Sequence, residues 1–161
     1  MSSVIFAVTK ENIHSRIFAN SAYTVRAREA MGIPPAIGER MLITADDKGI
    51  INPLIDDSVN EIHSHITRYH PGSSVEFNND AYGGYYMFTV NTPSNYPGDN
   101  EEKLTHCAES YIVNRTLQSW YTGIKPDEAA IIATKVQNDA ATMQILLTQR
   151  KKPSNRTHEI L

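Results

Sequence analysis

The chain has 161 residues, of which 15 are Lys or Arg, 18 are Asp or Glu, six are His and one is Cys, so its formal net charge is −3. One cysteine cannot form an internal disulfide, which excludes a disulfide scaffold and a zinc site made of four cysteines. No apolar run approaches the roughly 20 residues of a membrane helix, and the run from Val4 to Val8 is too short for the core of a signal peptide. Length and composition therefore predict one globular domain that is neither secreted nor inserted in a membrane.

Charge is unevenly distributed along the chain. Residues 1–149 carry a net charge of −6, whereas residues 150–161 carry +3. The basic residues of this last segment are Arg150, Lys151, Lys152 and Arg156. They complement the negative end of a helix, or bind an acidic surface on a neighbouring copy, or contact nucleic acid weakly. The sequence alone leaves these three interpretations open.

The first predicted helix begins at Thr9, which is a good N-cap residue. It continues without Pro or Gly to Met31, where Gly32 and the pair Pro34-Pro35 stop it. The following residues, 32–42, are rich in Gly and Pro and are expected to form an extended connection.

A second helix is predicted from the apolar pattern between Ile51 and Tyr69, where apolar residues recur every three or four positions. Thr44 and the two acids after it are typical of a helix start. Pro53 interrupts this region, so the simpler prediction places Asn52 as the cap and Pro53 at the first helical position. Pro71 and Gly72 end the helix.

Residues 73–92 predict a β-hairpin, because strand-forming residues flank turn-forming Asn, Asp and Gly residues. An isolated hairpin is marginally stable in water, so this one is expected to lie on a helical face or to pair with another chain. Four tyrosines gather in and after it, namely Tyr82, Tyr85, Tyr86 and Tyr96. Since no Lys or Arg lies between Arg68 and Lys103, we interpret them as a surface for protein rather than for stacked bases.

Two further helices are predicted in the C-terminal half. Asp99 caps the third, which Gly123 ends, and Pro126 opens the fourth, which Pro153 ends. The predicted fold is mainly α, a helical bundle of about four helices with an inserted β-hairpin. Residues 1–152 form a single domain in this prediction, and residues 153–161 form an extended basic C-terminal tail.

Motifs for catalysis are weak. The chain has no Gly-rich phosphate loop and no nucleophile elbow. A group of acid and imidazole side chains at Glu61, His63, His65 and His70 invites a metal site, but only two of them share a helix face, so a solvated face is the preferred interpretation. His106 and Cys107 point about 100° apart on a helix, so we expect Cys107 to be a small buried residue. The sequence therefore predicts no enzyme, no catalytic residues, no metal and no cofactor.

The order of the predicted elements resembles that of head-to-tail connector (adaptor) proteins of tailed bacteriophages. The matching stretch is residues 44–152. It comprises Thr44-Ala45-Asp46-Asp47 leading to the stripe from Ile51 to Tyr69, and then Glu102 to Trp120-Tyr121 followed by the helix at Pro126.

The resemblance implies a structural role in the virion neck, after assembly in the host cytoplasm. Its expected partners are a homo-oligomeric ring of twelve copies, the portal protein, and a downstream tail or neck protein, with passive contact to translocating DNA and none to a membrane. The candidate portal or intersubunit contacts are Arg150, Lys151, Lys152, Arg156, Tyr82, Tyr85 and Tyr86. The alternative is a small helical protein-interaction or regulatory protein that binds a partner through its Tyr-rich hairpin.

Overall fold

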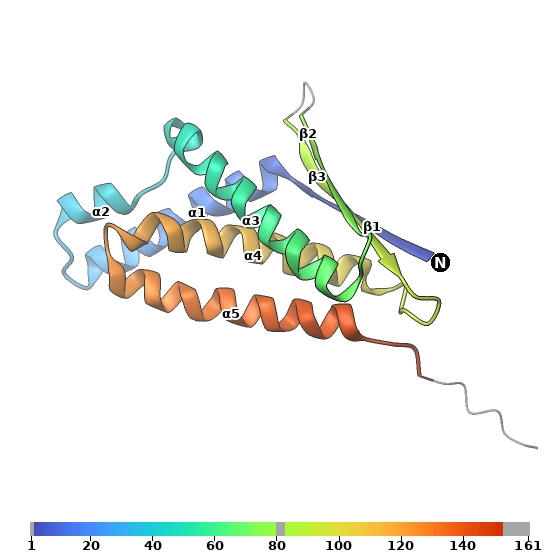
Figure 1. The fold of residues 1–161 in the computed structure, drawn as a ribbon. Helices are drawn as coiled ribbons and strands as arrows, with labels where there is room; N and C mark the ends of the chain where they lie inside the picture. Colours follow the sequence, from blue (N-terminus) through green and yellow to red (C-terminus); the bar gives the residue numbers. More distant parts are fainter. Residues whose placement is uncertain (1, 80–82, 153–161) are drawn as a thin grey trace, which may run out of the picture.

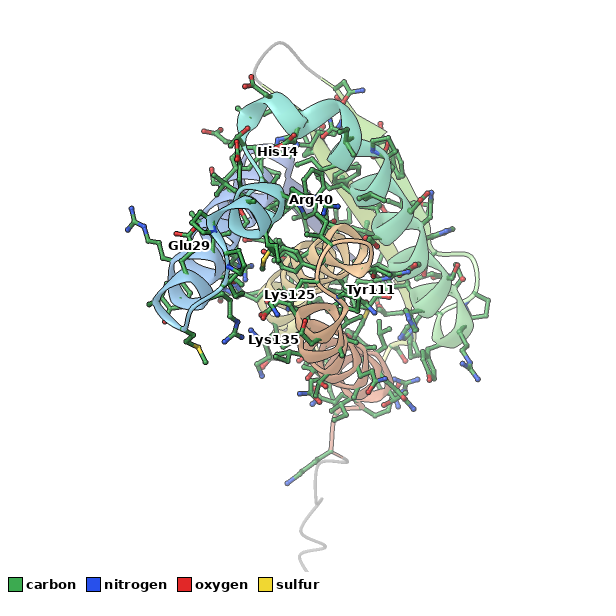
Figure 2. All side chains as sticks on the ribbon, turned by 90° about the vertical axis from the view of Figure 1, so that its left-hand side faces the viewer. His14, Glu29, Arg40, Tyr111, Lys125 and Lys135 are labelled. Atoms are coloured by element: carbon green, nitrogen blue, oxygen red, sulfur yellow. The ribbon has the colours of Figure 1, made fainter. Side chains whose placement is uncertain are left out.

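The computed structural model describes residues 2–79 and 83–152 (Figure 1). In these residues the chain is mainly helical and carries a small three-stranded antiparallel sheet. The helices are α1 (Lys10–Ala30), α2 (Pro35–Met41), α3 (Lys48–Tyr69), α4 (Asn100–Thr122) and α5 (Pro126–Thr148), with a 3₁₀ turn η1 (Ala45–Asp47) before α3. Seen end-on in Figure 2, α4 lies at the centre, with α1 and α2 on one side, α3 on the other and α5 beneath.

The sheet contains the predicted hairpin and one strand that the sequence analysis missed. Strands β2 (Ser74–Asn78) and β3 (Tyr85–Thr92) confirm the hairpin, and β1 (Ser2–Thr9) pairs with the far side of β3, so the order is β1-β3-β2. The apolar run from Val4 to Val8 thus forms part of a strand. Gly84 has a φ of +116°, and a Cβ there would lie 2.5 Å from the carbonyl oxygen of Asn78, so the turn requires glycine.

Thr9 is the N-cap of α1, as predicted, and it is also the last residue of β1. Its hydroxyl accepts a hydrogen bond from the backbone N–H of Asn12 at 3.3 Å, which satisfies one free donor of the first turn. The extended connection predicted for residues 32–42 is wrong in part, because residues 35–41 form α2. Pro35 is the first residue of α2, where its fixed φ suits a helix and its missing N–H costs nothing.

The predicted start of the second helix at Asn52 is also wrong. α3 begins at Lys48, and Pro53 lies inside it. A Thr44 and Asp47 capping box starts the preceding turn, with the backbone N–H of Thr44 donating to the Asp47 carboxylate at 2.8 Å. An internal proline costs about 3 kcal/mol, but burial of Ile51, which is fully covered, recovers roughly 1.5–3 kcal/mol. The upstream cap and this burial explain why the helix extends past the proline.

The core lies between the inner face of the sheet and the helices. The rings of Phe6 on β1 and Phe88 on β3 stack with centroids 4.9 Å apart, and both are almost fully buried. α4 packs against α5, α3, α1 and β1, as its two apolar strips predict. No helix in residues 2–79 and 83–152 is long and apolar enough to cross a membrane.

α5 ends at Thr148, earlier than the predicted limit at Pro153. The residue that follows, Gln149, has an extended backbone, and its N–H donates to the carbonyl of Ile145 at 3.1 Å. Residues 149–152 therefore lie beyond the end of α5, so Arg150, Lys151 and Lys152 are not part of its last helical turn. Residues 153–161, including Arg156, lie outside the described residues.

Candidate interaction surface

One long edge of the sheet is unpaired. β1 has β3 on one side and no strand of the described chain on the other. All eight residues of β1 pair with β3 in continuous register, and none of them is charged, proline or glycine. Native proteins usually protect such an edge with charges, prolines, bulges or a covering element. The edge of β1 shows none of the first three.

The outer face of the sheet, the side away from the helices, is also uncharged on β1 and β3. Its residues are Ser3, Ile5, Ala7 and Thr9 on β1 and Tyr85, Met87, Thr89 and Asn91 on β3. Ile5 lies near the middle and keeps 49% of its surface exposed. We call these eight residues, with the free edge of β1, the open sheet surface. It offers backbone hydrogen-bonding groups and apolar area together.

The predicted tyrosine surface is divided between the two faces. Tyr86 is 1% exposed, and its hydroxyl donates to the carboxylate of Asp56 on α3 at 2.7 Å, so it is unavailable to a partner in this fold. Burial and this hydrogen bond raise the pKa of Tyr86. Tyr85 faces outward, half-buried, and its hydroxyl accepts from the side-chain amide of Asn78 at 2.8 Å. Tyr82 lies outside the described residues.

The basic residues Arg150, Lys151 and Lys152 are exposed beside the loop that follows β3. The backbone N–H of Lys151 donates to the carbonyl of Asn95 at 2.6 Å, and a guanidinium nitrogen of Arg150 lies 3.3 Å from the carbonyl oxygen of Leu147. These contacts fix the start of the C-terminal segment at the end of the molecule where β1 begins (Figure 1). The structure thus brings the basic segment and one end of the open sheet surface to the same side.

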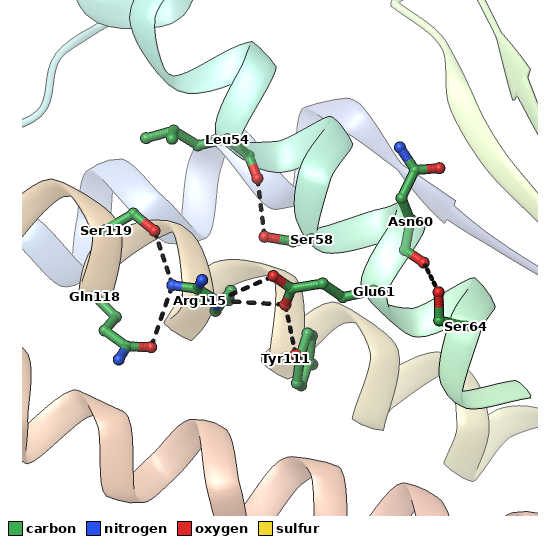
Figure 3. Close-up of polar contacts among 9 residues, drawn as sticks. All are labelled: Leu54, Ser58, Asn60, Glu61, Ser64, Tyr111, Arg115, Gln118 and Ser119. Carbon is green, nitrogen blue, oxygen red and sulfur yellow. Dashed lines mark hydrogen bonds and ion pairs between the residues drawn. The ribbon is translucent and has the colours of Figure 1, made fainter. Parts of the chain in front are cut away.

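The residues considered for a metal site have other partners. Glu61 on α3 accepts from the hydroxyl of Tyr111 at 2.6 Å and from Nε of Arg115 at 3.3 Å, both on α4 (Figure 3). His63 contacts the carbonyl of Ser73 at 3.1 Å, and His65 lies edge-on to the ring of Tyr111. In the part of the chain that the structure describes, no three His, Cys, Asp or Glu side chains gather as metal ligands would. The Glu61 contacts join α3 to α4.

His70 lies where three elements meet. It is 2% exposed and forms the C-cap of α3. Its Nδ1 lies 3.1 Å from the carbonyl oxygen of Asn91 on β3, and its Nε2 lies 2.7 Å from that of Leu147 on α5. The edge of the ring packs against Tyr96, whose hydroxyl donates to the carbonyl of Leu146 at 2.9 Å. We call this group the His70 junction.

Cys107 is buried on α4, as expected, and is 7% exposed. Burial, together with the nearby charge of Asp139, raises the pKa of its thiol to about 12. A thiol with this pKa stays protonated at neutral pH, and its contact with the backbone carbonyl of Asp139 at 3.2 Å joins α4 to α5. Cys107 is placed for packing rather than for nucleophilic chemistry.

A polar hollow of about 650 Å³ lies between the starts of α1 and α3. Its lining includes Lys10, His14, Lys48 and Asn52, and His14 is hydrogen-bonded to Asn52 at 2.7 Å. Figure 2 shows His14 near this end of α1. The hollow is also lined by Asn79 and Gly83, which flank residues 80–82, a segment that the structure does not describe.

The sequence patterns did not predict Ile5 and Ala7 as surface residues, and they did not predict the His70 junction. The uninterrupted run of strand formers before Thr9 was a usable signal for β1. No comparable signal existed for His70, because its partners are carbonyl groups 21 and 77 residues further along the chain. Comparison with known proteins found no matching family model, no matching curated protein and no matching solved structure.

Proposed function

We propose that the chain is a structural assembly protein, an adaptor-like ring subunit that joins the portal to the tail of a tailed bacteriophage. The observation that carries the proposal is the open sheet surface. A long neutral edge strand next to a face that is uncharged on β1 and β3 is a template for adding another strand, and a chain that functions as a monomer would be expected to protect it. A second copy of the chain is the proposed partner.

The two edges of the sheet are compatible with a head-to-tail ring. The two unpaired edges, β1 and β2, differ in length and sequence. If β1 of one copy meets β2 of the next, each contact is head-to-tail, and head-to-tail contacts close into rings when the rotation permits. Such a ring would carry a continuous sheet from subunit to subunit.

The basic segment supports the second part of the proposal. Arg150, Lys151 and Lys152 project at one end of the body, held there by the contacts to Asn95 and Leu147. A ring of head-to-tail copies would present these charges together on one rim. A rim of this kind suits an acidic surface on the portal.

Electron microscopy of the chain mixed with the portal ring of the same phage tests the proposal. We expect an added ring of density on the portal at saturating concentration of the chain. A chain that ends at Lys152 should keep the fold. It should bind the portal more weakly, because it lacks Arg156, one of the candidate portal contacts. A portal without added density would contradict the proposed function. Equal binding by the shortened chain would show that residues 153–161 do not contribute to portal binding.

A second measurement distinguishes the proposed ring subunit from the alternative, a regulatory protein that binds another partner through the hairpin. The alternative predicts a one-to-one complex, whereas a ring subunit predicts many copies on each portal. The mass of the complex in mass photometry distinguishes them.

A further inference from the structure

The hydrogen bonds of the sheet determine which residues of β1 face its free edge. In an antiparallel pair, residues that exchange backbone hydrogen bonds alternate with residues whose N–H and C=O point to the opposite side. The N–H of Lys10 continues the register of β1 with β3 and donates to the carbonyl of Gly84 at 3.0 Å. Even-numbered residues of β1 therefore bond to β3. The backbone groups of Ser3, Ile5 and Ala7 point to the free edge, and their side chains lie on the outer face.

The same reasoning applies to β2, which lies on the other side of β3 (Figure 1). Because even-numbered residues of β3 bond to β1, the odd-numbered ones bond toward β2. The N–H of Asn91 follows this rule, since it donates to the hydroxyl of Ser73, just before β2, at 2.9 Å. The backbone groups of Val75 and Phe77 then point to the free edge of β2. Their side chains lie on the inner face, because they pair with even-numbered, buried residues of β3.

The residues that point to the edge thus lie on the outer face in β1 and on the inner face in β2. In an antiparallel pair, two residues that exchange hydrogen bonds have their side chains on the same face. Antiparallel pairing of β1 with β2 of another copy would therefore place the helices of the two copies on opposite sides of the joined sheet. In a parallel pair, a residue that bonds to the partner strand lies beside a residue whose own groups point away. Parallel pairing therefore keeps all helices on one side.

Each edge carries an exposed large apolar side chain, Ile5 on β1 and Phe77 on β2. Phe77 keeps 41% of its surface exposed, although its ring meets that of Tyr86 edge-on with centroids 5.0 Å apart. Parallel addition of β1 from another copy brings Phe6 or Val8 of the inner face beside Phe77 and covers it. Antiparallel pairing of two β1 strands also matches the hydrogen-bonding pattern, but it leaves Phe77 and the edge of β2 uncovered.

We propose that β2 of a neighbouring copy adds to the free edge of β1 in the parallel direction. Both N–H and both C=O groups of Val75 and Phe77 of that copy then bond to β1. Glu76 of that copy lies beside Ile5 or Ala7 on the outer face, because only these two registers overlap all of β2 with β1 and keep the faces aligned. This inference rests on the proposed function, in which copies meet head to tail, and specifies the contact between them.

Disulfide cross-linking between full-length copies tests the direction of the added strand. Residues side by side on neighbouring strands lie about 5 Å apart, within the range that a disulfide spans. We mix Glu76→Cys with Ile5→Cys or with Ala7→Cys on the portal ring, add oxidised glutathione, and expect a cross-linked dimer with one of the two. The matched control, Val75→Cys, faces the inner side and should link to neither. Cys107 should not interfere, because it is buried and burial raises the pKa of its thiol to about 12.

The cross-links separate the failure of this inference from the failure of the proposed function. If Val75→Cys links to β1 in place of Glu76→Cys, the added strand is antiparallel. If Ile5→Cys links to itself, two β1 strands pair. Either result, or assembled copies in which Glu76→Cys links to neither β1 variant, would overturn this inference and leave assembly itself intact. A chain that does not assemble, alone or with the portal, would overturn the proposed function and this inference together.

A substitution at Phe77 tests the contact without cysteines. We expect Phe77→Ser to need about tenfold more protein to assemble, because assembly covers the part of the ring that stays exposed in a single copy. The control is Tyr23→Ser, which removes an aromatic side chain that is 76% exposed in the second half of α1 and should assemble as wild type does. Circular dichroism checks that both variants fold. Equal assembly by the two variants would contradict the parallel contact, and the cross-links still decide if Phe77→Ser fails to fold.

Discussion

The two faces of the three-stranded sheet are built from the same strands but have opposite character. On the inner face, residues such as Phe88 and Val90 are fully buried under the helices, whereas on the outer face Ile5 keeps 49% of its surface exposed. Side chains alternate along a strand, so neighbouring residues serve either the fold or the surface. Substitutions on the inner face can therefore disrupt the core without changing the proposed assembly surface. Substitutions on the outer face can change that surface without disrupting the core.

The largest expected difference between the faces concerns Phe88 and its neighbour Thr89. Phe88→Ala removes a buried ring that stacks on Phe6, so the free energy of unfolding should fall by about 3–5 kcal/mol. Thr89→Ala on the outer face should change it by less than about 0.5 kcal/mol. Urea unfolding followed by circular dichroism measures both changes. Similar losses in the two variants would show that the two faces do not differ in their contribution to stability.

A smaller difference is expected between the adjacent tyrosines. Tyr86→Phe removes a buried hydroxyl that donates to Asp56 at 2.7 Å, and a hydrogen bond to a charged group contributes about 1.5–3 kcal/mol. Tyr85→Phe removes a half-buried acceptor of Asn78, at a cost of roughly 0.5 kcal/mol. Thermal unfolding of the two variants at the same pH should rank Tyr86→Phe as clearly less stable. An equal loss of stability in the two variants would mean that the hydrogen bond from Tyr86 to Asp56 contributes no more than the one between Asn78 and Tyr85.

The smallest effect concerns a charge in the helical layer. Burial raises the pKa of Asp139, although the side-chain amide of Asn114 partly offsets this by donating to its carboxylate at 2.9 Å. Because the folded chain favours the protonated acid, this residue stabilises the fold most at low pH and the contribution is lost as pH rises. Asp139→Asn should therefore be more stable than wild type by a few tenths of a kcal/mol at neutral pH.

Unfolding measured from neutral pH downward checks this prediction. The gain of Asp139→Asn should shrink toward zero as the wild-type carboxylate becomes protonated. A gain that grows on acidification would reverse the assigned sign.

Sequence patterns predicted the elements whose signals are local. Thr9 was identified as a helix cap because its side chain acts three residues away, and the hairpin was identified because its strands and its glycines are adjacent in sequence. Pro53 misled the prediction of α3, because the burial that offsets its cost depends on tertiary packing. β1 was missed although its run of strand formers is local, and its pairing with β3 joins residues that lie 76 to 90 positions apart.

The candidate surface was predicted less well than the fold. Alternation in a strand says that Tyr85 and Tyr86 face opposite ways, but the helices decide which face is buried, and they cover Tyr86. The basic charges of Arg150 to Lys152 were visible in the sequence, whereas their direction is set by Asn95 and by the His70 junction. Contacts between segments distant in the chain were beyond the reach of local patterns.

The most direct test of the open sheet surface compares two isoleucines that are both 49% exposed, Ile5 on β1 and Ile131 on α5. Sedimentation velocity of Ile5→Lys, Ile131→Lys and wild type over a range of concentrations measures assembly, alone and with the portal ring. We expect Ile5→Lys to need about tenfold more protein to assemble, which corresponds to about 1.4 kcal/mol per contact. Ile131→Lys should assemble as wild type does. Equal assembly by the two variants would contradict the assignment of the open sheet surface as the assembly surface. A wild-type chain that stays monomeric both alone and with the portal would contradict it as well.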